Sequence, residues 1–163
     1  MTKKSGQRYW QDVAEGEELE PLAKVATTEM LVRFAGASGD FSPHHYDETL
    51  AERWFPGTGI IVHGALKAAW LGQLVTRWAG EGGRLRRLAT QDRGMDAPRH
   101  MRTRSEPEDG ETWLCKGRVT GKRIEDGTGC VDLEVWVEND SGRITTPGEA
   151  TVVLPVRPKQ GGS

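Results

Sequence analysis

The sequence predicts an α+β domain, with helices in the first half of the chain and antiparallel strands in the second. Two changes of pattern lead to this class. Apolar residues recur at helical spacing between residues 29 and 78, whereas from residue 113 onward they alternate with polar ones. Because the chain has 163 residues and no internal repeat, we expect one domain over residues 1–163, with loose ends at about 1–8 and 159–163.

A strand and a short helix are the first elements expected along the chain. Leu19–Thr27 alternates weakly between apolar and polar residues, which indicates a first strand. Thr27 or Thr28 can then cap a helix over Glu29–Ala37, because a threonine hydroxyl accepts hydrogen bonds from first-turn N–H groups. Gly39 follows and ends this helix.

Two more helices follow. A short one is expected over Asp47–Trp54, where Pro56 stops it. A longer one over Val62–Trp78 is apolar on most sides, so other elements should wrap it. Charged and polar residues interrupt the apolar stretch Ile60–Ala79, so we expect a core helix and not a membrane span.

The second half predicts a sheet of about five or six antiparallel strands. Residues 113–122 and Val131–Val137 alternate with one charged face, which is typical of strands solvated on one side. Glu125–Gly127 between them is a hairpin signal. Further strands are expected over Arg84–Gln91 and near Ala150–Leu154.

Charge and cysteine content exclude several classes of protein. With 22 Lys and Arg against 24 Asp and Glu, the chain has no basic excess for nucleic acid. The polar N-terminal residues lack a secretory apolar core, and two cysteines are too few for a disulfide framework. A hairpin near Asp126 would leave Cys115 and Cys130 on the order of 20 Å apart, so no disulfide is expected between them. We therefore expect a cytoplasmic protein with reduced thiols.

One segment concentrates groups suited to acid/base chemistry. In Ser38–His45, the carboxylate of Asp40 and the imidazole of His45 are five residues apart across a turn that contains Pro43. The pair His63-Gly64 then begins the long apolar helix. Such groups can move protons beside a carbonyl that backbone N–H groups polarise.

The segment from Ala37 to Leu66 resembles the MaoC-like family of (R)-specific enoyl-thioester hydratases and dehydratases. The resemblance implies a hot-dog fold, in which the antiparallel sheet wraps the long helix. It also implies that Asp40 and His45 are catalytic and that the N–H of Gly64 forms the oxyanion hole. Together they would orient one water, with His45 as the likelier base and Asp40 as its acid partner.

Two positions depart from the family's motif. Ser42 stands where asparagine is usual, and its hydroxyl can still form the turn. His44 stands where an aliphatic residue is usual and adds a second titratable ring. We expect it to line the rim of a substrate pocket together with Ser42 and His63, the latter in a mainly structural role.

The resemblance implies a carbon-oxygen lyase that hydrates a 2-enoyl thioester or dehydrates an (R)-3-hydroxyacyl thioester. The acyl group would be carried by coenzyme A or acyl carrier protein, without a separate cofactor or a metal. The pantetheine arm would enter between the subunits of a homodimer or a dimer of dimers. Arg99, Arg102 and Arg104 are candidate phosphate contacts, and Trp136 is a candidate interface residue.

Other interpretations remain open. Asp40 could only form a turn before Pro43, and His45 could be an ordinary surface histidine. The chain could be a non-catalytic acyl-binding partner in a heteromeric dehydratase. It could also be a hot-dog thioesterase, although the long helix between Val62 and Ala79 carries no carboxylate to activate water. The spacing of the histidines matches no zinc pattern.

Overall fold

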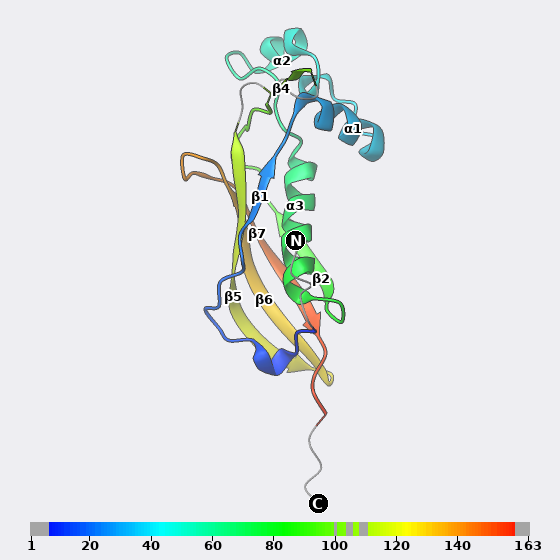
Figure 1. The fold of residues 1–163 in the computed structure, drawn as a ribbon, viewed down its shortest axis with the longest axis vertical. Helices are drawn as coiled ribbons and strands as arrows, with labels where there is room; N and C mark the ends of the chain where they lie inside the picture. Colours follow the sequence, from blue (N-terminus) through cyan, green and yellow to red (C-terminus); the bar gives the residue numbers. More distant parts are fainter. Residues whose placement is uncertain (1–6, 100, 104–105, 108–110, 159–163) are drawn as a thin grey trace, which may run out of the picture.

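A five-stranded antiparallel sheet is the frame of the molecule, which a computed structural model describes over residues 7–99, 101–103, 106–107 and 111–158. The strands lie in the order β1-β5-β6-β7-β2 (Figure 1). Their bounds are β1 Leu22–Val25, β2 Arg84–Thr90, β5 Thr112–Glu125, β6 Thr128–Glu138 and β7 Ile144–Leu154. A two-stranded ribbon pairs β3 (Met101–Thr103) with β4 (Glu106–Pro107).

The sheet curls around one helix, α3 (Gly64–Ala79), which packs against β2, β5, β6 and β7 (Figure 1). The seam is apolar on both sides: Leu66, Trp70, Leu71, Leu74 and Val75 of the helix are buried, as are Val119, Val131, Leu133, Val135 and Val152 of the sheet. Burial of each such side chain stabilises the fold by about 1.5–3 kcal/mol. Among the described residues, no helix is long and apolar enough to cross a membrane.

Short helices gather at the start of α3, the upper end in Figure 1. They are α1 (Thr28–Ser38), the 3-10 turn η2 (Pro43–His45) and α2 (Glu48–Trp54). Thr27 caps α1 by accepting a hydrogen bond from the N–H of Met30 at 3.2 Å. Gly39 ends α1 in the left-handed conformation (φ 77°), and Asp47 caps α2. The three predicted helices are confirmed.

The predicted hairpin joins β5 and β6. Its two loop residues, Asp126 and Gly127, have φ of 51° and 75°, which suits the right-handed twist of the two strands. Cys115 lies opposite Val137, whereas Cys130 lies opposite Arg123 near the loop. Both thiols are buried and free, as the ladder spacing predicted.

Strand β7 is longer than the sequence indicated, because it begins at Ile144 and not near Ala150. Pro147 lies within it, and proline usually argues against a strand interior. The carbonyl of Pro147 accepts a hydrogen bond from the N–H of Gln91 at 2.9 Å, so its nitrogen faces the same side. Since β2 ends at Thr90, the missing N–H interrupts no ladder at that point.

The chain before β1 docks on the sheet through the 3-10 turn η1 (Trp10–Asp12), which the sequence did not indicate. The indole N–H of Trp10 donates to the carbonyl of Cys130 at 3.2 Å. Arg8, expected in the loose end, forms an ion pair with Glu17. The remaining predicted ends, residues 1–6 and 159–163, lie outside the described residues.

Candidate active site

Asp40 is held as a carboxylate just after α1 ends. Its Oδ1 accepts hydrogen bonds from the hydroxyl of Ser42 at 2.7 Å and from the N–H of Ser42 at 3.1 Å. These two bonds lower the pKa of the Asp40 carboxyl below its usual value, chiefly through the hydroxyl. Serine therefore completes the turn in place of the family's usual asparagine.

His45 is a buried, neutral imidazole with a defined tautomer. Its Nδ1 lies 2.8 Å from the carbonyl oxygen of Ile61, and a carbonyl can only accept, so Nδ1 carries the proton. Nε2 therefore presents its lone pair, 3.8 Å from Oδ2 of Asp40. Burial lowers the pKa of His45, while the bond to Ile61 opposes this shift. At 3.8 Å the two groups are too far apart for a direct hydrogen bond, so one water can contact both.

Two more histidine rings contact this ring, and one of them is stacked on it. The ring of His63 lies 3.6 Å from that of His45, nearly parallel to it, and meets Phe34 edge-on. His63 is fully buried, and its Nε2 lies 3.4 Å from the carbonyl oxygen of Asp40. The ring centroid of His44 lies 4.0 Å from that of His45, and the two planes are tilted by 51°. His63 therefore restricts the orientation of the His45 ring by packing against it.

Asp40, His45 and His63 have ligand atoms within 4.8 Å of one another, close enough to consider a metal ion. The planes of the two imidazoles are only 19° apart. Lone pairs lie in the plane of each ring, so those of two stacked rings run side by side and do not converge on one ion. As arranged, these residues do not fit a metal ion.

Gly64 is the first residue of α3, and a carboxylate packs directly against it. A Cβ at this position would lie 1.9 Å from Oδ2 of Asp92. Any larger residue here would displace the side chain of Asp92, which follows β2. The sequence analysis missed Asp92, because nothing in the local pattern links the end of β2 to the start of α3.

A cavity of about 720 Å³ opens beside these groups, and its lining includes His44, His45, Gly64, Lys67 and Asp92. Asp40, whose side chain is 42% exposed, is not among the lining residues. Of the three predicted pocket residues, His44 lines the cavity, whereas Ser42 and His63 do not. Ser42 bonds to Asp40 instead, and His63 packs on the ring of His45.

Of the three predicted phosphate contacts, the structure describes the side chain of Arg99 alone, and this side chain does not reach the cavity. The guanidinium of Arg99 donates to the hydroxyl of Thr112 at 3.1 Å, beside the start of β5, and Arg99 does not line the cavity. The side chain of Arg102 and the whole of Arg104 lie outside the described residues. Arg93 and Arg143 line the cavity instead.

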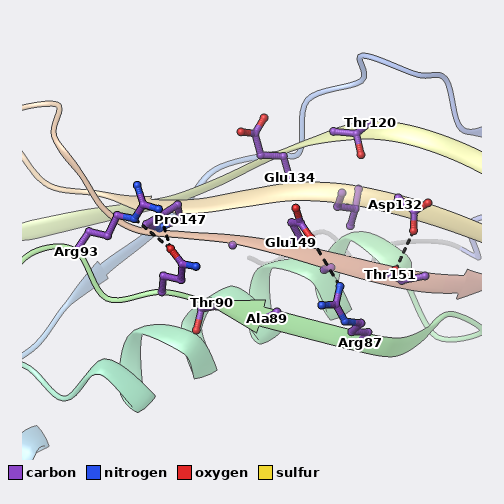
Figure 2. A pocket seen from close by; sticks show the side chains of 14 residues that line it. Arg87, Ala89, Thr90, Arg93, Thr120, Asp132, Glu134, Pro147, Glu149 and Thr151 are labelled. Atoms are coloured by element: carbon purple, nitrogen blue, oxygen red, sulfur yellow. Dashed lines mark hydrogen bonds and ion pairs between the residues drawn. The ribbon is translucent and has the colours of Figure 1, made fainter.

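Figure 2 shows a second hollow of about 830 Å³ on the face of the sheet that points away from α3. Each carboxylate in its lining is paired with an arginine. Arg87 meets Glu149 at 3.7 Å, Arg118 meets Glu134 at 2.7 Å, and Arg123 pairs with Asp132. We interpret this hollow as a solvated outer face, because its carboxylates are paired and no motif residue lines it.

The curled sheet and the buried helix define a hot-dog domain, with Asp40 and His45 close to the start of the helix. The model of the MaoC-like domain matches residues 11–93, just over half of the chain. The chain therefore belongs to the MaoC-like dehydratase family. No curated protein sequence matches it.

Solved structures agree on the fold. The (R)-hydratase from A. caviae involved in PHA biosynthesis is 23% identical, with a TM-score of 0.74 over 89% of this chain and 99% of that chain. R-hydratase PhaJ1 from Pseudomonas aeruginosa is 20% identical, with a TM-score of 0.72 over 91% and 86%. A chain of the ChsH1-ChsH2 complex from Mycobacterium tuberculosis is 19% identical, with a TM-score of 0.68 over 86% and 98%. These likenesses confirm the hot-dog fold.

Proposed function

We propose that this protein catalyses the reversible hydration of a 2-enoyl thioester to the (R)-3-hydroxyacyl thioester. The observation that carries the proposal is the close pairing of the His45 imidazole with the Asp40 carboxylate. Nε2 of His45 and Oδ2 of Asp40 are 3.8 Å apart and can hold one water between them. Family membership and the neighbouring (R)-hydratase structures support the same reaction.

In this reaction His45 is the base. Its Nε2 takes a proton from the water while the water oxygen bonds to the β carbon of the substrate. The electrons of the double bond move toward the thioester carbonyl, whose oxygen becomes enolate-like. The proton on His45 then passes to the α carbon, and the carbonyl is restored.

Asp40 is better suited to orient the water than to donate a proton. Its pKa is lowered by Ser42, so it remains a carboxylate at neutral pH and accepts a hydrogen bond from the water. It also faces the imidazolium that forms on His45 during the reaction and stabilises it. This assignment replaces the expectation that Asp40 is the acid partner.

Hydrolysis of the thioester is the second candidate, and Asp92 favours it. The sequence offered no carboxylate on the long helix, yet the structure holds one against Gly64 at its start. Incubation with crotonyl-CoA separates the two reactions. Loss of the enoyl absorbance without release of free thiol supports hydration, and release of free thiol supports hydrolysis. The absence of both changes supports the non-catalytic partner role.

The pH dependence of hydration should reflect His45. Because burial lowers the pKa of this imidazole, the acid limb of kcat/KM against pH is expected to have its midpoint below 6.5. Activity is present above that pKa, where the base is neutral, and falls as His45 protonates. A midpoint above 6.5 would contradict the lowered pKa of His45.

Replacing His44 by leucine restores the family's usual residue. His44 packs against Phe55 and lines the cavity, and its ring meets the ring of His45 at a tilt of 51°. His44→Leu is therefore expected to keep the reaction and to alter mainly acyl preference or the pH profile, measured with enoyl thioesters of different length. A loss as deep as that of His45→Gln would show that the wrong histidine was chosen.

We also propose that the protein is a homodimer or a dimer of dimers. Strands β1 and β2 are the outer strands of the sheet, so each has one side available for pairing. Trp136 is half-buried within the protomer, where its indole N–H lies 3.4 Å from Glu138. Light scattering at micromolar concentration should give at least twice the chain mass of 18.0 kDa. The mass of a single chain would contradict this proposal.

A further inference from the structure

A buried lysine is part of the lining of the active-site cavity, three residues after Gly64 on α3. The side chain of Lys67 is 1% exposed, and its ammonium has two hydrogen-bond acceptors and one further ion-pair partner. Oδ2 of Asp96 lies at 2.8 Å, the carbonyl of Gly94 at 3.1 Å and Oδ1 of Asp92 at 3.3 Å. An ammonium is rarely buried so deeply unless it is paired.

The two acids that pair with Lys67 differ in their surroundings. Asp96 is 1% exposed and permanently balances the charge of the lysine. Asp92 is 51% exposed and belongs to the cavity wall. It is therefore the partner that can leave Lys67 without stranding a charge in the core, because water can solvate its carboxylate.

The carboxylate of Asp92 fills the place beside Gly64. Oδ2 lies 1.9 Å from the position of a Cβ on Gly64, and Oδ1 accepts a hydrogen bond from the hydroxyl of Thr146 at 3.3 Å. An anionic oxygen thus already lies between the backbone of Gly64 and the ammonium of Lys67, on the cavity that His45 also lines. A thioester oxygen cannot reach this face of Gly64 while Asp92 remains there.

We propose that Lys67 is a second, cationic donor of the oxyanion site, and that Asp92 occupies the place that the enolate oxygen takes. The inference rests on the proposed hydration. As water adds to the β carbon, negative charge moves to the carbonyl oxygen, and this oxygen replaces Asp92 against Lys67 and Gly64. Lys67 gives up no proton. When the α carbon is protonated, the carbonyl is neutral again and Asp92 returns.

Charge balance favours this exchange. One anion replaces another, so Lys67 and Asp96 stay paired and the net charge around them does not change. A hydrogen bond from an ammonium to an anionic oxygen is also about twice as strong as one between neutral groups. Lys67 therefore adds to the stabilisation that the N–H of Gly64 alone would give.

The test combines one double variant and one single variant. Lys67→Met together with Asp96→Asn removes the ammonium and its buried counter-charge together, so that no charge is stranded in the core. Asp92→Ala removes the competing carboxylate and leaves Lys67 paired with Asp96. Lys116→Met with Glu138→Gln is the matched control, because it removes an ion pair of 2.9 Å on β5 and β6, outside the cavity lining.

Acetoacetyl-CoA supplies a readout that does not require turnover, since its enolate absorbs in the near ultraviolet. We expect wild type to bind this enolate and Asp92→Ala to bind it more tightly. The Lys67→Met/Asp96→Asn variant should lose the enolate absorbance and about two orders of magnitude in hydration turnover. The control pair should match wild type in both.

The proposal is overturned if the folded Lys67→Met/Asp96→Asn variant keeps the enolate absorbance, or if Asp92→Ala binds the enolate more weakly than wild type. It is also overturned if Asp92→Ala abolishes release of free thiol, because Asp92 would then be the hydrolytic carboxylate. Failure of wild type to hydrate any enoyl thioester would instead refute the proposed function. Lysine-dependent binding of the enolate would still support the anion site in that case.

Discussion

Asp40→Asn and His45→Gln are each expected to remove most hydratase activity and to leave the fold intact. Asparagine cannot accept the water's hydrogen bond with a full negative charge, and glutamine cannot take its proton. Because both side chains act on one water, the double variant should be little worse than either single variant. Turnover of crotonyl-CoA and thermal unfolding would be measured for all three proteins.

Asp132→Asn is a suitable control for Asp40→Asn. It is the same chemical change, made at a half-buried carboxylate that accepts a hydrogen bond from Thr151 on the other face of the sheet. We expect this variant to hydrate at the wild-type rate. Near-normal turnover by a folded Asp40→Asn protein would refute the role assigned to Asp40.

The Gly64→Pro variant is expected to fold, but its turnover in hydration should be about two to three orders of magnitude lower than that of wild type. Proline removes the N–H that would face the enolate oxygen, and the first position of a helix tolerates proline best. The interaction strengthens in the transition state, so turnover should fall more than affinity. Steady-state kinetics would separate the two effects.

Gly64→Ala is the matched comparison, and the structure changes what it means. A Cβ at this position meets the carboxylate of Asp92, so alanine and proline both push Asp92 away from Lys67. Only proline also removes the N–H, so Gly64→Ala should lose less turnover than Gly64→Pro. Adding Asp92→Ala should relieve the crowding in Gly64→Ala. Equal damage from alanine and proline in well-folded protein would mean that Gly64 matters only for space.

The sequence by itself determined the elements whose signals are local. The cap at Thr27 and the glycine at position 39 bound α1, and the period-two alternation marked β5 and β6. Asp40 and His45 could be paired from sequence because a short turn through Pro43 leaves five-residue neighbours little freedom to separate. Strands β3 and β4 and the start of β7 gave no such signal, since prolines in or near them obscured the strand pattern.

The surroundings of Asp40 and His45 follow from contacts between segments that are distant in the sequence. The tautomer of His45 depends on the carbonyl of Ile61, sixteen residues away, and its burial depends on the stack with His63. The contact of Asp92 with Gly64 and Lys67 exists because the chain leaving β2 passes over the start of α3. Periodicity reports which face of an element is buried. It does not report which distant segment covers that face, and here this segment determines the charge beside the proposed oxyanion site.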